Sequence, residues 1–239
     1  MPHTQHKEPE MAQSRKTNKA NEAKARTQRI VFIAIAVVVL LAGGFAVVSG
    51  GDSPTSGGTG SVPNGAGEFQ DAEIIGDALP AQPESGTDPA IGMKVPEIRA
   101  RNFDGGPVSL RIASVKRPTM VVFLAHWCPH CNREVPRILE LDAQGGIPAE
   151  LRVVGVATGS RDDQPNWPPS VWLEEMKWKW EVAADSQDGR IFAAYGGMSF
   201  PTMVLVAPDG SVMDRFSGEA EVSELEARIT AFLQKVSPV

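Results

Sequence analysis

The sequence predicts an α/β domain, with a mixed central sheet flanked by helices, over residues 91–239. Strand patterns and helix patterns alternate along this part of the chain, from about Ile91 to Val236. The continuous apolar run 120–124 is typical of a strand that is buried on both faces. A helical stripe follows it directly and contains Val135, Ile138 and Leu139. A strand between two helical layers explains both observations.

The first half of the domain is expected to contain two buried strands and one long helix. A short strand at 108–112 follows the turn residues Asp104-Gly105-Gly106. The long helix begins near Cys128 and ends before Gly145-Gly146. The run 151–157 is the next buried strand, so the strand at 120–124 has a neighbour that a helix connects to it.

The second half begins with a polar, proline-rich loop at 158–169. Two short helices are expected at 170–177 and 188–195, and Gly196-Gly197 ends the second of them. The runs 202–206 and 211–216 are expected to form a β-hairpin, because Pro, Asp and Gly lie between them.

A last helix is expected to begin at Ser223. Glu226 follows three residues later, which is the spacing of a capping box. The apolar residues after it form one stripe, which indicates that one face of this helix packs against the domain.

The chain before residue 91 has a different composition. Residues 1–29 are rich in Lys and Arg and are expected to form a basic cytoplasmic tail, and residues 30–48 form an apolar run close to the ~20 residues that span a bilayer. The excess of basic residues on the amino-terminal side predicts a single-pass protein of the cytoplasmic membrane with an extracytoplasmic C-terminal domain. A cleaved signal peptide is the alternative, but the apolar run is longer than usual for one. Residues 49–90 are expected to be a flexible linker and an irregular extension, and the pattern leaves open whether 68–90 is disordered or lies on the domain.

The charge of the chain excludes one class of function. The formal net charge is −6 and the calculated pI is about 5.3. Nucleic-acid binding needs a basic face, so no nucleic-acid partner is expected.

Cys128 and Cys131 are the only cysteines in the chain. A disulfide between residues this close stabilises a fold by only roughly 2 kcal/mol in the chain-entropy model, so the pair is not a structural staple. Thiol chemistry and metal binding remain. Cys128 lies at a predicted strand-to-helix junction, where unpaired N–H groups and the helix dipole favour an ionised thiolate. Cys131 lies one turn further along, where it can attack a mixed disulfide formed at Cys128.

The chain from 91 to 236 resembles the thioredoxin superfamily and, within it, the membrane-tethered thiol-disulfide oxidoreductases of the TlpA/ResA kind. The segments that carry the resemblance are Gly92-Met93-Lys94-Val95-Pro96, Trp127-Cys128-Pro129-His130-Cys131, Glu134-Val135-Pro136, the stretch from Ala194-Tyr195-Gly196 to Phe200-Pro201-Thr202, and Asp209-Gly210. The resemblance implies a thioredoxin fold tethered to one N-terminal transmembrane helix. It also implies an exposed, attacking Cys128, a shielded, resolving Cys131 and a cis peptide bond before Pro201.

Further residues are assigned to the site with this resemblance. Phe200 is expected to offer its backbone and ring to a substrate, and Trp127 to pack beside the cysteines. Glu134 is expected to exchange a proton with Cys131, with an ordinary acid near the start of a helix as the alternative. The position six residues before Cys128 is Val122, where thioredoxins carry a buried aspartate, so Glu134 is the candidate carboxylate.

Different roles are expected for His130 and His126, the two histidines near the cysteines. A protonated His130 would stabilise a thiolate at Cys128 and make the disulfide more oxidising, as the same Pro-His dipeptide in DsbA proteins suggests. The alternative is an exposed loop histidine without an electrostatic role. His126 is expected to be a surface residue at the rim of the site.

The predicted function is an extracytoplasmic protein thiol-disulfide oxidoreductase that uses Cys128 and Cys131 and no cofactor. The TlpA/ResA resemblance favours reduction of protein disulfides, whereas the Pro-His dipeptide favours oxidation. The expected partners are protein thiol or disulfide substrates and a membrane protein that recycles the cysteine pair. The alternative is a copper metallochaperone in which Met198, Met203 or His130 completes the site. A structural zinc site is not expected, because so few ligands on one short turn cannot form a tetrahedron.

Overall fold

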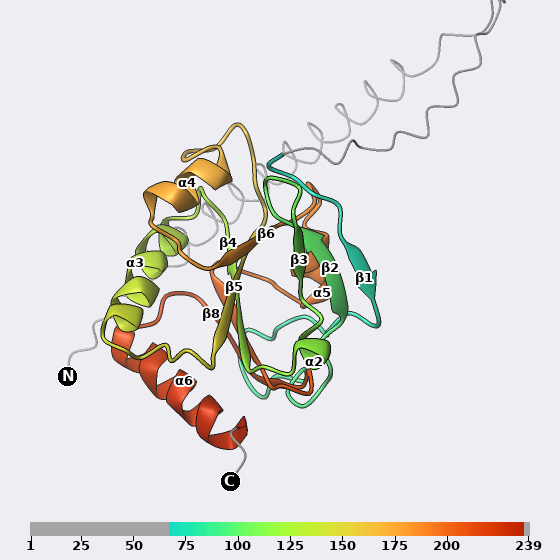
Figure 1. The fold of residues 1–239 in the computed structure, drawn as a ribbon, viewed down its shortest axis with the longest axis vertical. Helices are drawn as coiled ribbons and strands as arrows, with labels where there is room; N and C mark the ends of the chain where they lie inside the picture. The colour runs from blue at the N-terminus through green and yellow to red at the C-terminus, as the bar shows by residue number, and fades with distance from the viewer. Residues whose placement is uncertain (1–66, 237–239) are drawn as a thin grey trace, which may run out of the picture. The chain divides into compact units, whose positions relative to one another are not determined.

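The computed structural model describes residues 67–236 (Figure 1). The predicted tail 1–29, the predicted transmembrane helix 30–48 and the first part of the predicted linker, 49–66, lie outside the described residues. Within residues 67–236, no helix has the length and apolar character needed to span a bilayer. The α/β domain is therefore the part of the prediction that the structure describes.

One mixed sheet forms the centre of the described domain. Its order is β1-β2-β6-β5-β4-β7-β8, with β3 paired to β2. β4 and β5, and β5 and β6, are parallel, whereas β7 pairs antiparallel with β4 and with β8. The strands are β1 (Glu73–Ile75), β2 (Glu97–Arg101), β3 (Pro107–Ser109), β4 (Thr119–Leu124), β5 (Arg152–Ala157), β6 (Glu181–Ala184), β7 (Thr202–Val206) and β8 (Val212–Ser217).

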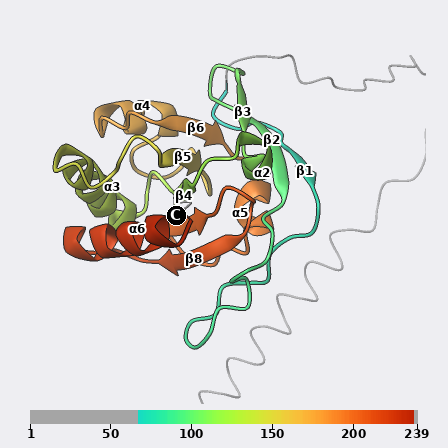
Figure 2. The same cartoon turned by 60° about the horizontal axis from the view of Figure 1, so that its bottom comes forward.

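Helices cover both faces of this sheet (Figure 2). One face packs against α3 (Pro129–Ala143), α4 (Pro169–Glu175) and α6 (Val222–Val236). The other face packs against α2 (Ile112–Val115), α5 (Arg190–Ala194) and the extension before β2. All six residues of β4 are buried, with Val121 and Phe123 in one core cluster and Val122 in the other. The prediction of a strand buried on both faces is confirmed.

The segment 67–90 lies on the domain as an irregular extension. The sequence left open whether this segment is disordered or lies on the domain, and the structure shows the second. Leu79 N–H donates to the Ala194 carbonyl at 2.9 Å, and Gln82 N–H donates to the Gly196 carbonyl at 2.9 Å. Asp88 forms an ion pair of 2.6 Å with Arg215, whose side chain is fully buried. The extension is therefore anchored to α5 and to β8.

Two predicted boundaries are wrong. The strand predicted at 108–112 ends at Ser109, where its register with β2 ends, and Ile112 begins the short helix α2. The helix predicted to begin at Ser223 begins at Val222, because the Glu221 carbonyl accepts the first helical N–H groups. Ser223 therefore lies inside the first turn and is not the N-cap of a capping box.

The other predicted elements are confirmed within a few residues, and three strands were missed. The hairpin forms as β7 and β8, with a register irregularity at 205–206. The two short predicted helices form as α4 and α5, and Gly196 after α5 has a φ of 64°. The unpredicted strands β1, β2 and β6 contain only three to five residues each.

Candidate active site

Cys128 lies between the buried strand β4 and the first turn of α3. It is the N-cap residue of α3, with an extended backbone at φ −75° and ψ 120°, and Pro129 occupies the start of the helix. The Cys128 N–H donates to the Ala125 carbonyl at 3.0 Å, and its own carbonyl accepts from Asn132 N–H at 3.1 Å. The predicted strand-to-helix placement is confirmed: Cys128 is at the helix start, where unpaired N–H groups are found, although its side chain makes no capping hydrogen bond.

Both cysteines are free thiols in this structure, and both are buried. Cys128 retains 5% of its accessible surface and Cys131 retains none. The expectation of an exposed Cys128 is wrong, because the residue packs within the core cluster under α3 and faces the Phe200 carbonyl. The expected difference in accessibility is nevertheless found, since Cys128 is more accessible than Cys131.

The Cys131 thiol is held in its neutral form. Burial raises the pKa of this thiol far above its usual value, and the nearby Cys128 and Glu134 raise it further. The Ala125 N–H, 3.4 Å from the sulfur, acts in the opposite direction. Cys131 can therefore attack a disulfide only when a neighbouring group accepts its proton.

Phe200 and Pro201 lie directly against the cysteine that is expected to attack. The peptide bond between them is cis, which confirms the expectation from the resemblance. The Cys128 sulfur is 3.7 Å from the Phe200 carbonyl oxygen. The Phe200 ring meets Trp127 edge-on, with centroids 6.0 Å apart. The structure thus brings both predicted aromatic residues to Cys128.

Gly159 supports this aromatic pair from the loop after β5. Its carbonyl accepts a hydrogen bond of 2.8 Å from the Trp127 indole N–H. Its φ is 59°, and a Cβ placed there would lie 3.0 Å from the Phe200 ring. A glycine is therefore needed here for both its backbone and its lack of a side chain. No local sequence motif marks this glycine.

Glu134 is fully buried on α3, three residues after Cys131. Its Oε2 accepts a hydrogen bond of 3.0 Å from the Ala220 N–H, and Arg137 lies 3.7 Å from the same oxygen. Its Oε1 has no hydrogen-bond partner. Burial raises the pKa of the carboxyl to about 7, although the Ala220 N–H and Arg137 partly oppose that rise. Such a group can accept and return a proton at neutral pH.

His130 is 57% exposed in its side chain and is paired with a carboxylate that the sequence did not predict. Its Nδ1 lies 2.5 Å from Oε1 of Glu219, which also contacts Arg133 at 2.6 Å. Hydrogen bonds from Arg133 and His130 lower the pKa of Glu219 to about 2. Glu219 lies 89 residues after His130, between β8 and α6, and no local motif marks it.

His126 is buried, so its prediction as a surface residue at the rim is wrong. The Pro165 carbonyl lies 2.7 Å from Nδ1, and the Arg161 N–H donates to Nε2 at 3.1 Å. Trp167 packs edge-on against the ring, at a centroid distance of 5.8 Å. Burial lowers the pKa of His126. The loop 158–168 covers the residue, and this fold-back could not be seen in the local pattern.

The methionines considered as copper ligands lie in different environments. Met203 is fully buried in the core under the helices, whereas Met198 is 66% exposed. Among residues 67–236, no group of three or more His, Cys, Asp or Glu side chains is arranged to hold a metal ion. The cysteine pair thus has no third ligand of these types among the described side chains.

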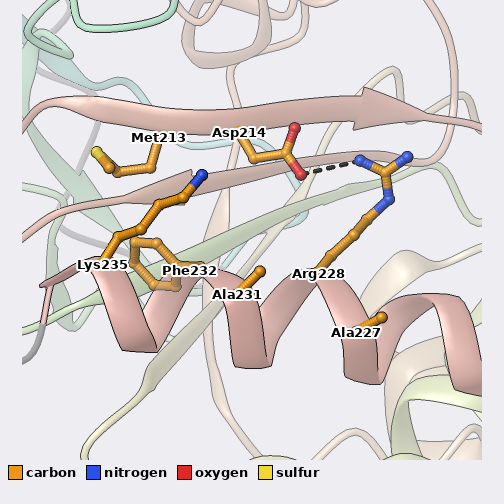
Figure 3. A pocket seen from close by; sticks show the side chains of 7 residues that line it. All are labelled: Met213, Asp214, Ala227, Arg228, Ala231, Phe232 and Lys235. Atoms are coloured by element: carbon orange, nitrogen blue, oxygen red, sulfur yellow. Dashed lines mark hydrogen bonds and ion pairs between the residues drawn. The ribbon is translucent and has the colours of Figure 1, made fainter.

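A groove of about 390 Å³ lies away from the cysteines, between β8 and α6 (Figure 3). Arg228 crosses it to Asp214, with a contact of 2.9 Å. The other lining residues are Met213, Ala227, Ala231, Phe232 and Lys235. The groove shares no residue with the cysteine site.

Comparisons with known proteins place the chain in a family and find several similar proteins. Residues 91–215 match the model of the AhpC/TSA family. Two relatives are thiol-disulfide oxidoreductases named ResA, from Bacillus thuringiensis subsp. konkukian and Bacillus anthracis. Each is 26% identical over 149 residues, which is 62% of this chain and 79% of the relative.

Two solved structures are also similar. A secreted Mycobacterium tuberculosis disulfide oxidoreductase homologous to Escherichia coli DsbE is 25% identical, with a TM-score of 0.46 over 56% of this chain and 94% of that one. StoA from Bacillus subtilis is 18% identical, with a TM-score of 0.46 over 59% of this chain and 99% of that one.

The chain therefore belongs to the AhpC/TSA family, in the thioredoxin superfamily. The relatives named ResA are what the chain is similar to, and together with the family match they support an oxidoreductase.

Proposed function

We propose that the chain is an extracytoplasmic oxidoreductase that reduces protein disulfides with the Cys128/Cys131 pair. The Cys128 thiolate attacks a substrate disulfide, and the substrate sulfur that leaves takes up a proton. Cys131 then attacks the Cys128 sulfur of the mixed disulfide and its proton passes to Glu134. The second substrate sulfur leaves as a thiolate and takes up a proton from solvent. Two electrons and two protons have then passed to the substrate, and the pair has become a disulfide.

The observation that carries this proposal is the pairing of a buried neutral thiol with a buried carboxyl on the same helix. Cys131 must lose a proton at the moment of attack, and Glu134 has a pKa of about 7 because of its burial. A purely structural thiol would need no such neighbour. Glu134 can afterwards return the proton to solvent, because a carboxyl with a pKa of about 7 also ionises at neutral pH.

The direction of electron flow is argued from His130. A histidine beside the thiolate favours an oxidising pair only if its positive charge is free to stabilise the thiolate. In the structure the ring is bound to Glu219, a carboxylate that also binds Arg133. Because this carboxylate compensates the charge of Arg133 and would compensate a protonated His130, we take reduction as the working direction.

The location and the recycling partner are proposed from the sequence before residue 67. The apolar run 30–48, preceded by basic residues, supports a membrane anchor with the oxidoreductase domain outside the cytoplasm. Each turnover leaves the cysteine pair oxidised, so a dithiol donor must reduce it again. An anchored domain is well placed to receive those electrons from a membrane protein. Fusion of the full chain to a reporter enzyme that is active only outside the cytoplasm tests the orientation, and an inactive, folded fusion would contradict it.

A trapping experiment tests the chemistry. Without the resolving thiol, the Cys131→Ser variant of the full chain should accumulate mixed disulfides between Cys128 and its substrates, seen as bands that disappear on reduction. The matched control is the Cys128→Ser, Cys131→Ser double variant, which should trap none. If the folded Cys131→Ser variant traps no more than this control, the proposed function is wrong.

A further inference from the structure

We propose that Glu219 is a positioning residue that sets the reduction potential of the cysteine pair, by compensating the positive charges beside Cys128. The inference rests on the proposed function and adds to it a residue from outside the Cys128–Cys131 motif. Glu219 does not contact either sulfur in the structure. It acts through the side chains of α3 that it holds.

Several side-chain donors from the first turns of α3 converge on this one carboxylate. His130 Nδ1 is 2.5 Å from Oε1, and Arg133 contacts both oxygens, at 2.6 Å for its nearest nitrogen. Arg137 reaches Oε2 at 3.1 Å. Two further acids border the cluster: Glu221 pairs with Arg137 at 2.9 Å, and the buried Glu134 lies 3.7 Å from the same arginine. Glu219 is the acid that joins all three of these bases.

Glu219 also lies next in sequence to a residue that contacts the proposed proton acceptor, Glu134. The next residue, Ala220, donates its N–H to Oε2 of Glu134. One short segment between β8 and α6 therefore contacts the proton acceptor with its backbone and the basic side chains with a carboxylate. A side-chain substitution at Glu219 leaves this backbone contact in place, although the Glu219 charge also contributes to the raised pKa of Glu134.

Electrostatics gives the sign of the effect. Arg133 lies early in α3, whose N-cap residue is Cys128, so an uncompensated guanidinium would favour the thiolate there. A stabilised thiolate stabilises the reduced pair and makes the disulfide a stronger oxidant. Because the Glu219 carboxylate is only 21% exposed and binds Arg133 and His130 directly, it offsets this effect. Glu219 thus keeps the pair reducing.

The test is the Glu219→Gln substitution in the full chain, which keeps the shape of the side chain and removes its charge. Equilibration with glutathione redox buffers should show an equilibrium constant shifted about tenfold towards the reduced pair, which corresponds to a potential about 30 mV more positive. The matched control is Glu221→Gln, which removes an exposed carboxylate that pairs with Arg137 but with neither His130 nor Arg133. This control should shift the equilibrium constant less than twofold.

A double variant shows whether Arg133 or His130 causes the shift in potential. If the shift survives when Glu219→Gln is combined with His130→Gln, the charge of Arg133 carries it, and if it disappears, His130 carries it. Either result supports the proposal. An unchanged or more negative potential in a folded Glu219→Gln variant would overturn it. That result would leave the proposed function intact as long as the Cys131→Ser variant still traps substrates.

Discussion

Oε2 of Glu134 and the N–H of Ala220 form a 3.0 Å hydrogen bond across 86 residues of sequence. Arg137 lies 3.7 Å from the same oxygen, whereas Oε1 is buried without a partner. These contacts on Oε2 alone stabilise the ionised form of a buried carboxylate incompletely. The result is a carboxyl with a pKa of about 7, which can change its charge under working conditions.

The first prediction concerns proton transfer from Cys131. With a mixed disulfide between Cys128 and glutathione, the rate at which Cys131 releases glutathione should rise through pH 7 as Glu134 ionises. Glu134→Gln should slow this release by about 10²-fold at pH 7 and remove the inflection. Stopped-flow measurement from pH 5.5 to 8.5 checks it. Glu140→Gln, an exposed position on the same helix, is the control, and persistence of the inflection in Glu134→Gln would contradict the assignment.

The second prediction concerns stability. The pKa of Glu134 is raised from 4.5 to about 7, so the folded state binds the proton more tightly than the unfolded state. This stabilisation is complete below about pH 4.5 and is lost as the pH rises through 7. The parent protein loses this stabilisation between pH 5 and pH 8, whereas Glu134→Gln does not. The free energy of unfolding of the variant, relative to that of the parent, should therefore be roughly 2 kcal/mol higher at pH 8 than at pH 5. Urea denaturation at the two pH values measures it, and an equal difference at both values would argue against a buried, titrating carboxyl.

A third prediction has the opposite sign and concerns His126. Its pKa is lowered by burial, and a protonated Nε2 could not accept the hydrogen bond from Arg161 N–H. The stabilisation by neutral His126 is therefore present above about pH 6.5 and is lost as the pH falls through the lower pKa of the folded state.

Urea denaturation in a Glu134→Gln background isolates this effect, because Glu134 then no longer titrates. The stability advantage of His126 over a His126→Gln variant should be larger at pH 7.5 than at pH 5 by about 1 kcal/mol. Equal advantages at the two pH values would mean that the loop 158–168 tolerates a charged ring.

A fourth prediction concerns the support of Phe200. Gly159→Ala adds a Cβ 3.0 Å from the Phe200 ring at a residue with φ of 59°. We expect a loss of stability of about 1–2 kcal/mol. In a Cys131→Ser background we also expect several-fold less trapped substrate, because the displaced ring changes the surface beside Cys128.

Gly145→Ala is the matched control for this substitution. Gly145 also has a positive φ, 83°, but a Cβ there would meet nothing within 4 Å. It should lower stability through backbone strain alone and leave trapping unchanged in the same background. If both glycine variants trap equally, Phe200 does not need the space that Gly159 leaves.

Local sequence patterns were sufficient to predict the centre of the fold and the position of the cysteines. The apolar run of β4 and the stripe of α3 are continuous in the sequence, and Cys128 lies where they meet. β6 was missed because it has four residues, of which only the last two are buried, so neither alternation nor a long apolar run is present.

The missed parts of the site depend on contacts between distant segments. His126 is buried because Arg161 and Pro165, 35 and 39 residues later, supply its hydrogen-bond partners. Glu219 was not recognised because an isolated acid before a helix is common, and only the folded chain brings it to His130. Glu134 could be proposed from its spacing to Cys131, but its missing partner at Oε1 is visible only in three dimensions.

The ion pair between Asp88 and Arg215 has a consequence for where the folding unit begins. The family match starts at residue 91, so a fragment cut at that point would lack the carboxylate. It would also lack the Pro80 carbonyl, which accepts from the same guanidinium at 3.0 Å. The cut would leave the buried guanidinium of Arg215, on β8, without the carboxylate that compensates its charge. Expression boundaries taken from sequence similarity alone would thus remove a stabilising part of this domain.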